Sequence, residues 1–350
     1  MHRLSMTGPA WAPPATLALP ALSAVLALLA GCGGGGGASD PAPPPPPPLP
    51  PPSGPSEAQR IAAATTTASG NAACTAVAPF YWEVGDRNAA RARGSVNRAG
   101  NTTVYTTDTS MALASATKWL FAAYVVELRA GTLSADEVRH LHFRSGHTSF
   151  VSCLPGQTVD GCLALPAANG AYTAATDGRF FYGGGHMQKL ASLVGLGNMN
   201  NGALATELRT LLGDDVAISF NQPQLAGGAQ GTPADYARFL RKMLDGRLRL
   251  GALLGTQAVC TNPATCANAL ATPVPAGESW NYSLGHWVEL DPVLGDGAYS
   301  SAGAFGFYPW IDATRSWYGV LARQAAAGSG NESASCGRLI RKAWVSGVAP

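Results

Sequence analysis

Charged side chains are scarce in this sequence. Only 13% of its 350 residues are charged, the formal net charge is +2, and the basic residues form no run. Proteins that bind a nucleic-acid backbone or an anionic membrane surface carry clustered lysine and arginine. The composition therefore argues against a polybasic membrane patch, and we expect no nucleic-acid partner.

Several site signatures are missing as well. The sequence lacks the Gly-x-Ser-x-Gly elbow of α/β-hydrolases, and the glycines at 183–185 follow neither the Walker nor the dinucleotide-binding spacing. The six histidines show no zinc-protease spacing, and a pair such as His140 and His142 is more often a polar surface or strand feature than a ligand pair. We expect no metal and no cofactor.

A long apolar run is absent, and the nearest approach to one is residues 15–30. This run is short for a membrane span and ends in small residues, which favours a signal peptide over a transmembrane helix. Its end, Leu29-Ala-Gly-Cys32, resembles the bacterial lipobox, in which the cysteine becomes the lipidated first residue. Gly33, rather than an aspartate, follows and implies the outer membrane. We expect a lipoprotein signal peptide over 1–32, and an exported protein anchored in the membrane of the cell envelope through Cys32.

Residues 33–56 are rich in glycine and then in proline. Such a segment cannot bury a core; its glycines form a flexible joint and its prolines a stiff polyproline II spacer of about 3 Å per residue. We expect a linker that holds one globular domain, residues 57–350, away from the membrane. A proline-rich tract that binds a partner domain is the alternative.

Cysteine is also infrequent, with six residues besides Cys32. An even number in an exported protein indicates three disulfides. Two pairs are close enough in sequence to close small loops, which leaves one residue near each end of the domain. Counting alone leaves other pairings open. The predicted pairs are Cys153–Cys162, Cys260–Cys266 and Cys74–Cys336.

Only four lysines occur, and one of them, Lys118, follows Ser115 by three positions at the head of an apolar run. On a helix, residues three apart lie on one face, so the hydroxyl and the amine are neighbours. Burial makes a lysine amine a base near neutral pH, and a serine beside such a base is an acyl-transfer nucleophile. The alternative is a structural pair, with Ser115 capping a helix and Lys118 extending to solvent.

Periodicity and turn residues predict the elements of the domain. The predicted helices are 57–68, the helix headed by Ser115, 232–244 and 333–345; the predicted strands are 80–86, 92–104, 282–290, 303–312 and 317–323. Strands at both ends of a mostly helical middle predict an α+β fold. An antiparallel sheet flanked by helices (57–130 and 271–350) would adjoin a second, mostly helical lobe (131–270), with the active site between them.

Five segments, in order, resemble the motifs of the serine β-lactamase superfamily, in the branch of class C β-lactamases, D-amino-acid peptidases and β-lactamase-fold esterases. They are Ser115-Ala-Thr-Lys118 (Ser-x-x-Lys), 141–147 (the His-Thr-Ser-Gly segment), 181–190 (Tyr-x-Asn and its helix), 226–228 with the helix after it, and 301–304 (Lys-Thr-Gly or His-x-Gly). The resemblance covers most of residues 80–345 and implies a β-lactamase-like fold.

The resemblance implies a role for each matched residue. Ser115 attacks an acyl carbonyl, Lys118 deprotonates it, and Tyr182 assists as base and then as acid to the leaving group. The backbone N–H groups of Ser115 and Ala304 form an oxyanion hole. Tyr182 follows two phenylalanines, so a core position is its alternative. The implied substrate-binding positions are Gly184, Ser301 and Gly303.

Two of these positions depart from the family pattern. Gly184 stands where the family has an asparagine that holds a substrate amide, and Ser301 where it has a lysine or histidine that attracts a carboxylate. A charge-assisted contact to a carboxylate contributes roughly 1.5–3 kcal/mol, so its loss favours esters or neutral amides. We expect a serine hydrolase that forms an acyl-enzyme on small-molecule or polymer substrates, with esterase activity well above β-lactamase activity.

Two other functions stay open. One is a β-lactamase or D-amino-acid peptidase that acts on β-lactams or cell-wall peptides. The other is a cell-envelope binding protein whose catalytic centre has decayed, which the two departures permit. Aromatic residues near the third motif would form an apolar acyl pocket or belong to the core. They are Trp280, Tyr282, Trp287, Phe305, Phe307 and Trp310.

Overall fold

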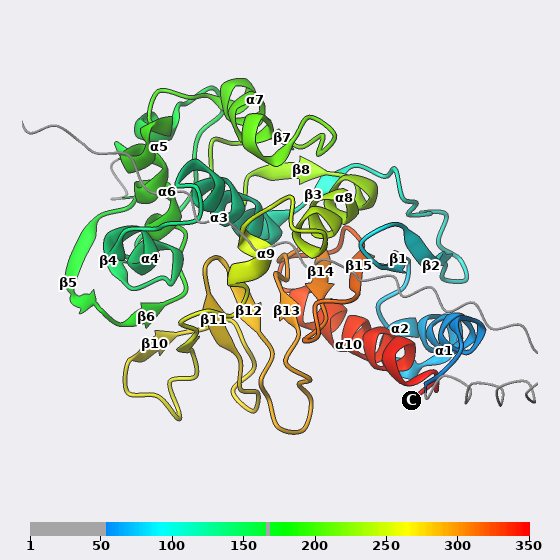
Figure 1. Ribbon diagram of the computed structural model, residues 1–350. Coiled ribbons are helices and arrows are strands. Elements are labelled where there is room, and N and C mark those ends of the chain that lie inside the picture. The colour runs from blue at the N-terminus through cyan, green and yellow to red at the C-terminus, as the bar shows by residue number, and fades with distance from the viewer. Residues whose placement is uncertain (1–53, 166–168) are drawn as a thin grey trace, which may run out of the picture. The chain divides into compact units, whose positions relative to one another are not determined.

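A large antiparallel sheet runs through the structure, a computed structural model that describes residues 54–165 and 169–350 (Figure 1). Within these residues, eight strands are ordered β2-β1-β15-β14-β13-β12-β11-β9, and each neighbouring pair is antiparallel. The strands are β1 Phe80–Gly85, β2 Ala90–Val96, β9 Val259–Cys260, β11 Asn281–Ser283, β12 His286–Val288, β13 Tyr299–Ser300, β14 Tyr308–Ile311 and β15 Tyr318–Ala322. Because β1 pairs with β15, the first and last strands of the domain are neighbours.

Helices cover both faces of this sheet, as Figure 1 shows. Helices α1 (Glu57–Gly70) and α10 (Gly330–Ser346) pack together on one face, and α8 (Pro233–Leu244) packs on β14 and β15 from the other. Their N-termini follow the predicted chemistry, since Ser56 and Thr232 each form a capping box. Helix α3 (Thr117–Leu128) is buried on all sides from Thr117 to Val126, as a helix that is apolar all round must be.

The predicted strands are confirmed in kind but not all in extent. Strands 80–86 and 317–323 correspond to β1 and β15, whereas the strand predicted over 92–104 ends at Val96. The strand predicted over 282–290 is two strands, because Leu284 and Gly285 both have positive φ angles (38° and 78°) and reverse the chain in a two-residue turn. The strand predicted over 303–312 begins only at Tyr308.

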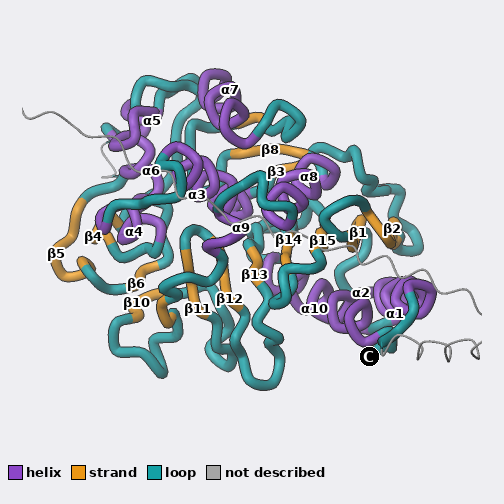
Figure 2. Tube along the Cα trace, viewed as in Figure 1, coloured by secondary structure: helices purple, strands orange, loops and turns teal. Residues whose placement is uncertain are grey.

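A second set of helices and short strands gathers to the left of the sheet and above it in Figure 2. The helices are α4 Ala135–Leu141, α5 Val159–Leu163, α6 Gly185–Ala191 with a π-helical turn Ser192–Leu196, and α7 Asn201–Leu212; the short strands include β3 Met111–Ala112, β4 Ser145–His147, β5 Tyr172–Asp177, β6 Phe180–Phe181, β7 Ser219–Phe220, β8 Ala229–Gly231 and β10 Ala269–Ala271. Strand β9 lies in the range 131–270 predicted as the helical lobe, but it forms the edge of the main sheet. The predicted α+β architecture, an antiparallel sheet with flanking helices, is confirmed.

Three disulfides within the described residues join the predicted partners. Cys74–Cys336 links the short helix α2 (Ala72–Thr75) to α10, across 262 positions of the chain. Cys153–Cys162 and Cys260–Cys266 close local loops. The predicted signal peptide, Cys32 and almost all of the linker lie outside the described residues. No helix among residues 54–165 and 169–350 has the length and apolar character needed to cross a membrane.

Candidate active site

Ser115 lies in a single 3₁₀ turn, Ala114–Ala116, that leads directly into α3. The preceding residue, Ala114, has a φ of 45°, a conformation that L-residues with a side chain rarely adopt. Strained backbone of this kind persists only where the surroundings over-determine it, and it clusters at functional sites. Ser115 is therefore presented on a constrained turn at the positive end of a buried helix.

Contacts from two other segments hold this turn. The Tyr236 hydroxyl on α8 donates to the Ala116 carbonyl oxygen at 2.8 Å, and the Ser301 hydroxyl donates to the Ser115 carbonyl oxygen at 3.1 Å. A Cβ at position 303 would collide with the Leu113 carbonyl oxygen, so only glycine allows this close approach. Ser301 and Gly303, predicted as substrate-binding, thus lie behind Ser115 and support the turn.

Lys118 lies beside Ser115, as the three-residue spacing predicts. Its Nζ is 2.9 Å from the Ser115 Oγ and also donates to the Ala226 carbonyl oxygen. The side chain is buried, and burial lowers the pKa of its amine to about 7. Near neutral pH a large fraction of Lys118 is therefore unprotonated. In that state the amine can donate one N–H to the Ala226 carbonyl oxygen and accept a hydrogen bond from the Ser115 hydroxyl.

Tyr182 follows β6 and faces the same pair. The Lys118 Nζ lies 5.0 Å from the centroid of its ring. Burial raises the pKa of the phenol to about 12, although the nearby Ser115 hydroxyl opposes that shift. The phenol is therefore protonated at neutral pH and has a proton to donate.

Neighbours on several elements set the position of Tyr182. Its ring stacks on Trp287 with 5.1 Å between centroids, and its backbone N–H donates to the Ala271 carbonyl oxygen. Buried His186 contacts the Phe181 carbonyl oxygen through Nε2 and the Ser145 hydroxyl through Nδ1. Burial lowers the pKa of His186 to about 3, so the ring is neutral and can donate at Nε2 while it accepts at Nδ1.

Ala304 supplies a backbone N–H next to Ser115. Its carbonyl oxygen accepts a hydrogen bond from the Ser329 N–H, which fixes the peptide. Within the described part of the chain, the Ala304 N–H itself donates to no protein acceptor. Ser115 and Ala304 line the same two cavities. This arrangement suits an oxyanion site built from two backbone N–H groups.

The two cavities meet at Ser115 and Ala304. The first chamber, about 450 Å³, is lined by Lys118, Phe150, Gly184, Gln224 and Ala226, among others. The second chamber, about 240 Å³, is lined by Tyr182, Val274, Trp280, Trp287, Ala302 and Asn331, among others. Among the described residues that line either chamber, Lys118 is the only lysine, arginine, histidine, aspartate or glutamate.

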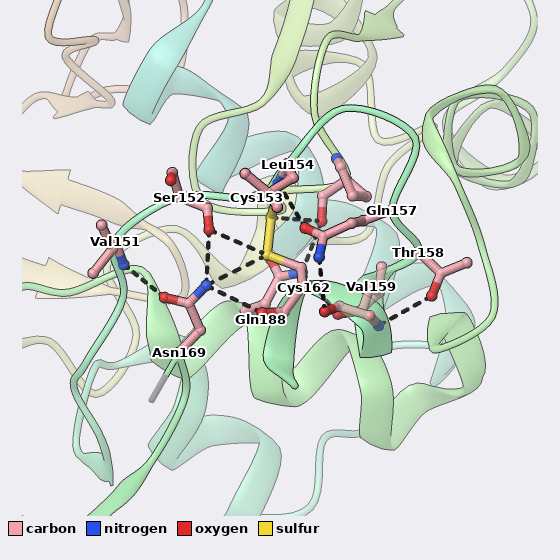
Figure 3. Close-up of a disulfide and its surroundings, with 12 residues drawn as sticks. Val151, Ser152, Cys153, Leu154, Gln157, Thr158, Val159, Cys162, Asn169 and Gln188 are labelled. Carbon is pink, nitrogen blue, oxygen red and sulfur yellow. Dashed lines mark hydrogen bonds between the residues drawn. A yellow bond between two sulfur atoms is a disulfide. The ribbon is translucent and has the colours of Figure 1, made fainter. Parts of the chain in front are cut away.

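The glycine at 184 has a structural cause. A Cβ there would lie 3.0 Å from Phe150 Cγ, so the Phe150 ring fills the space beside the backbone. Phe150 lies outside the five motif-like segments, and no local pattern in the sequence indicates that it reaches this site. Figure 3 shows how the next residues are held: the Val151 N–H donates to Asn169 Oδ1 at 2.7 Å, close to the Cys153–Cys162 disulfide.

Comparison with known proteins identifies the fold. No protein-family model and no curated protein sequence matches the chain. Among solved structures, EstCE1, described as a hydrolase with promiscuous acyltransferase activity, matches with a TM-score of 0.59 at 11% identity, over 81% of this chain and 99% of its own. D-amino acid amidase from Ochrobactrum anthropi matches at 0.56 and 13%, over 75% and 93%. A protein from Bacteroides dorei described as a β-lactamase matches at 0.51 and 21%, over 75% and 93%.

The chain has the serine β-lactamase fold. The superfamily resemblance of the five sequence segments is therefore confirmed at the level of the fold. Within this β-lactamase fold the predicted residues Ser115, Lys118 and Tyr182 come together, and Gly184 and Ala304 line the adjoining chambers. The Tyr182 side chain packs against Tyr282 and Trp287 of the core and also lines the second chamber.

Proposed function

We propose that this protein is a serine hydrolase that cleaves esters or neutral amides through an acyl-enzyme on Ser115. One observation carries the proposal: the Ser115 Oγ lies 2.9 Å from a buried lysine whose pKa is lowered to about 7. A serine hydroxyl is a weak nucleophile at its ordinary pKa and needs an adjacent base. Neutral Lys118 is such a base, and burial keeps it neutral.

The geometry supports acylation in the following order. The Ser115 Oγ attacks the acyl carbonyl carbon and passes its proton to Lys118, while the Ser115 and Ala304 N–H groups bind the oxygen that becomes negative. The leaving atom takes the Tyr182 proton as its bond to carbon breaks. Lys118, now an ammonium beside the Tyr182 ring, returns its proton to the phenolate. Both side chains are then neutral again.

Deacylation repeats these transfers with water. Neutral Lys118 accepts a proton as water attacks the Ser115 ester, the same two N–H groups bind the oxyanion, and Ser115 regains its proton when the ester bond breaks. No charge remains on the site between turnovers. This cycle asks the substrate only for a reactive carbonyl.

The substrate class follows from the lining of the chambers. A β-lactam or a peptide C-terminus brings a carboxylate, and a buried carboxylate without a partner is costly. The Ser301 hydroxyl is committed to the Ser115 carbonyl, and Lys118 is the only basic side chain among the described lining residues. The lining therefore favours neutral substrates over β-lactams and D-amino-acid peptides. The intact Ser115–Lys118 pair gives no support to a decayed centre.

An activity-based probe tests the proposal. A fluorophosphonate should label the wild-type domain covalently, and the labelled protein should no longer hydrolyse esters. Ser115→Ala should abolish both the label and the turnover of aryl esters. Lys118→Met should be nearly as severe. Ser69→Ala, an exposed serine on α1, is the matched control and should behave as wild type. Turnover that persists in a folded Ser115→Ala variant would sink the mechanism.

We also propose that the protein is exported and anchored by a lipid at Cys32, on the strength of the lipobox-like segment 29–32 and the apolar run before it. Disulfides are typical of exported proteins, and the domain contains them. The Cys32→Ser variant should leave the membrane fraction and lose metabolic labelling with palmitate. A variant that still sediments with membranes would contradict the anchor.

A further inference from the structure

The two chambers differ in which reactive side chain they contact. Both include Ser115 and Ala304, but Lys118 lines only the first chamber and Tyr182 only the second. The attacked carbonyl must lie at the junction, with its oxygen at the Ala304 N–H. The two halves of a substrate then extend in opposite directions from that point.

Proton transfer decides which half enters which chamber. A group that donates a proton in the transition state must lie within hydrogen-bond reach of the atom that receives it. Tyr182 is the protonated acid of the site, so the leaving atom must lie on its side. The leaving group therefore extends into the second chamber, and the acyl group into the first.

The second chamber offers an apolar surface. Trp280, Trp287 and Val274 form its walls, and the Trp280 indole N–H is occupied by Glu278 Oε2 at 3.0 Å. Asn331 donates its amide N–H to the Pro273 carbonyl oxygen at 3.0 Å, which ties α10 to the loop before Val274 and closes one side. No charged side chain is among the described residues that line this chamber.

Its size suits a small apolar group. An apolar protein cavity of roughly 150 Å³ holds one benzene molecule, and the second chamber, which is partly open to solvent, measures about 240 Å³. A single ring with a short substituent fits inside it. An ionised group would lose its hydration without gaining a partner.

We propose that the second chamber is a leaving-group site that selects neutral, apolar alcohols or amines that carry about one ring. The substrates would then be esters or amides of such compounds. This rests on the proposed hydrolase function, because Tyr182 assigns the chamber its role only if Ser115 acylates.

Matched esters of one acid test this selection. Methyl acetate and benzyl acetate have leaving alcohols of similar acidity, and 4-carboxybenzyl acetate adds a charge to the same ring. We expect kcat/KM for benzyl acetate to exceed that for methyl acetate by about tenfold or more, and the carboxylate to remove that advantage. Equal values for all three esters would overturn the proposal.

Filling one chamber at a time separates the two sites. Val274→Phe should lower the benzyl-to-methyl ratio about tenfold. Val151→Phe, at the 69% exposed residue that borders the first chamber, should leave that ratio near the wild-type value and instead alter the preference for acyl length. Val274→Ala, which enlarges the second chamber, should improve turnover of 1-naphthylmethyl acetate relative to benzyl acetate. A ratio that responds to Val151 and not to Val274 would place the leaving group in the first chamber.

Direct binding keeps the two proposals distinguishable. Benzyl alcohol should bind the Ser115→Ala variant and change the fluorescence of Trp280 and Trp287, and the added Val274→Phe substitution should weaken that binding about tenfold. Absence of probe labelling and of all turnover would refute the hydrolase but leave this measurement valid. Normal turnover without saturable binding of benzyl alcohol would refute the leaving-group role of the second chamber and leave the hydrolase proposal intact.

Discussion

At the scale of single residues, Lys118 combines a catalytic advantage with a cost in stability. The apolar helix α3 and the site around it exclude water from the amine, and this exclusion lowers its pKa to about 7. The same burial costs free energy whenever the amine is protonated. Two measurements follow from this single shift.

The first measurement is the pH dependence of turnover. Lys118 accepts the Ser115 proton only when it is neutral, and the neutral form dominates above its pKa. We expect kcat/KM for a neutral ester to rise with pH and to level off above an apparent pKa of about 7. Tyr182, with a pKa of about 12, stays protonated throughout this range. A profile that is flat between pH 5.5 and 8.5, under conditions where chemistry limits the rate, would contradict Lys118 as the base.

The second measurement is the stability of Lys118→Met. The amine has a pKa of about 7 in the folded protein and 10.5 as its unperturbed value. Between these values the unfolded chain binds more protons, so the contribution of this group to stability rises with pH; below about 7 the full penalty remains. The shift corresponds to roughly 3–5 kcal/mol. We expect methionine to stabilise the fold by several kcal/mol at pH 6 and much less at pH 10.5, in urea unfolding. Equal effects at both pH values would show that the shift is absent.

The Ser115–Lys118 pair could be predicted because helical spacing is a local property of the sequence. Phe150 could not, since nothing local indicates that residues 148–152 cross in front of Gly184. The orientation of Ser301 was equally hidden, because its hydroxyl bonds to Ser115, 186 positions away. Tertiary contacts of this kind decide which matched positions touch a substrate.

At the scale of elements, α10 is attached to the sheet by a buried ionic network. Arg341 on α10 donates to Glu289 Oε2 at 2.9 Å and to both carboxylate oxygens of Asp296 at 2.8 Å, and its guanidinium lies over the Trp310 ring. Arg341 and Glu289 are almost fully inaccessible to solvent. Removal of one partner would leave a buried charge uncompensated.

Arg341→Met should therefore lower the free energy of unfolding by roughly 3–5 kcal/mol. The double variant Arg341→Met with Glu289→Gln should recover part of that loss, because the fully buried Glu289 charge is removed as well, whereas Asp296 still loses its partner. Urea unfolding of the two variants at pH 7 measures both values. If the stability loss of the double variant equals the sum of the losses of Arg341→Met and Glu289→Gln measured separately, the two residues are not electrostatically coupled.

Elements also show where sequence periodicity fails. Residues 282–290 read as one strand because they include aromatic and β-branched residues, yet Leu284 and Gly285 reverse the chain after Ser283. A leucine with positive φ is a poor turn signal. The reversal places β11 and β12 side by side, and this brings Trp287 against Tyr182. The prediction of a single strand would have separated them.

At the scale of the whole molecule, the order of strands and helices was predictable and their connections were not. The predicted sheet with helices on its faces is present, because alternating apolar segments and caps are local signals. The adjacency of β1 and β15 depends on contacts over more than two hundred positions. Local patterns do not contain the register of that pair; the order of elements, with strands at both ends of a helical middle, indicated only that both ends share one sheet.

The Cys74–Cys336 disulfide fastens these two ends of the domain. It links α2 to α10 across 262 positions, and both cysteines are fully buried. Cys260–Cys266 closes a loop of only 6 positions between half-buried residues. A disulfide that closes a long loop removes more entropy from the unfolded chain than one that closes a short loop. We expect Cys74→Ala with Cys336→Ala to cost roughly 3–5 kcal/mol, and Cys260→Ala with Cys266→Ala about 1–2 kcal/mol. Urea unfolding of the two double variants under non-reducing conditions compares them directly, with near-ultraviolet circular dichroism to verify that each begins folded. Equal losses in the two variants would show that the longer loop brings no greater stabilisation than the short one.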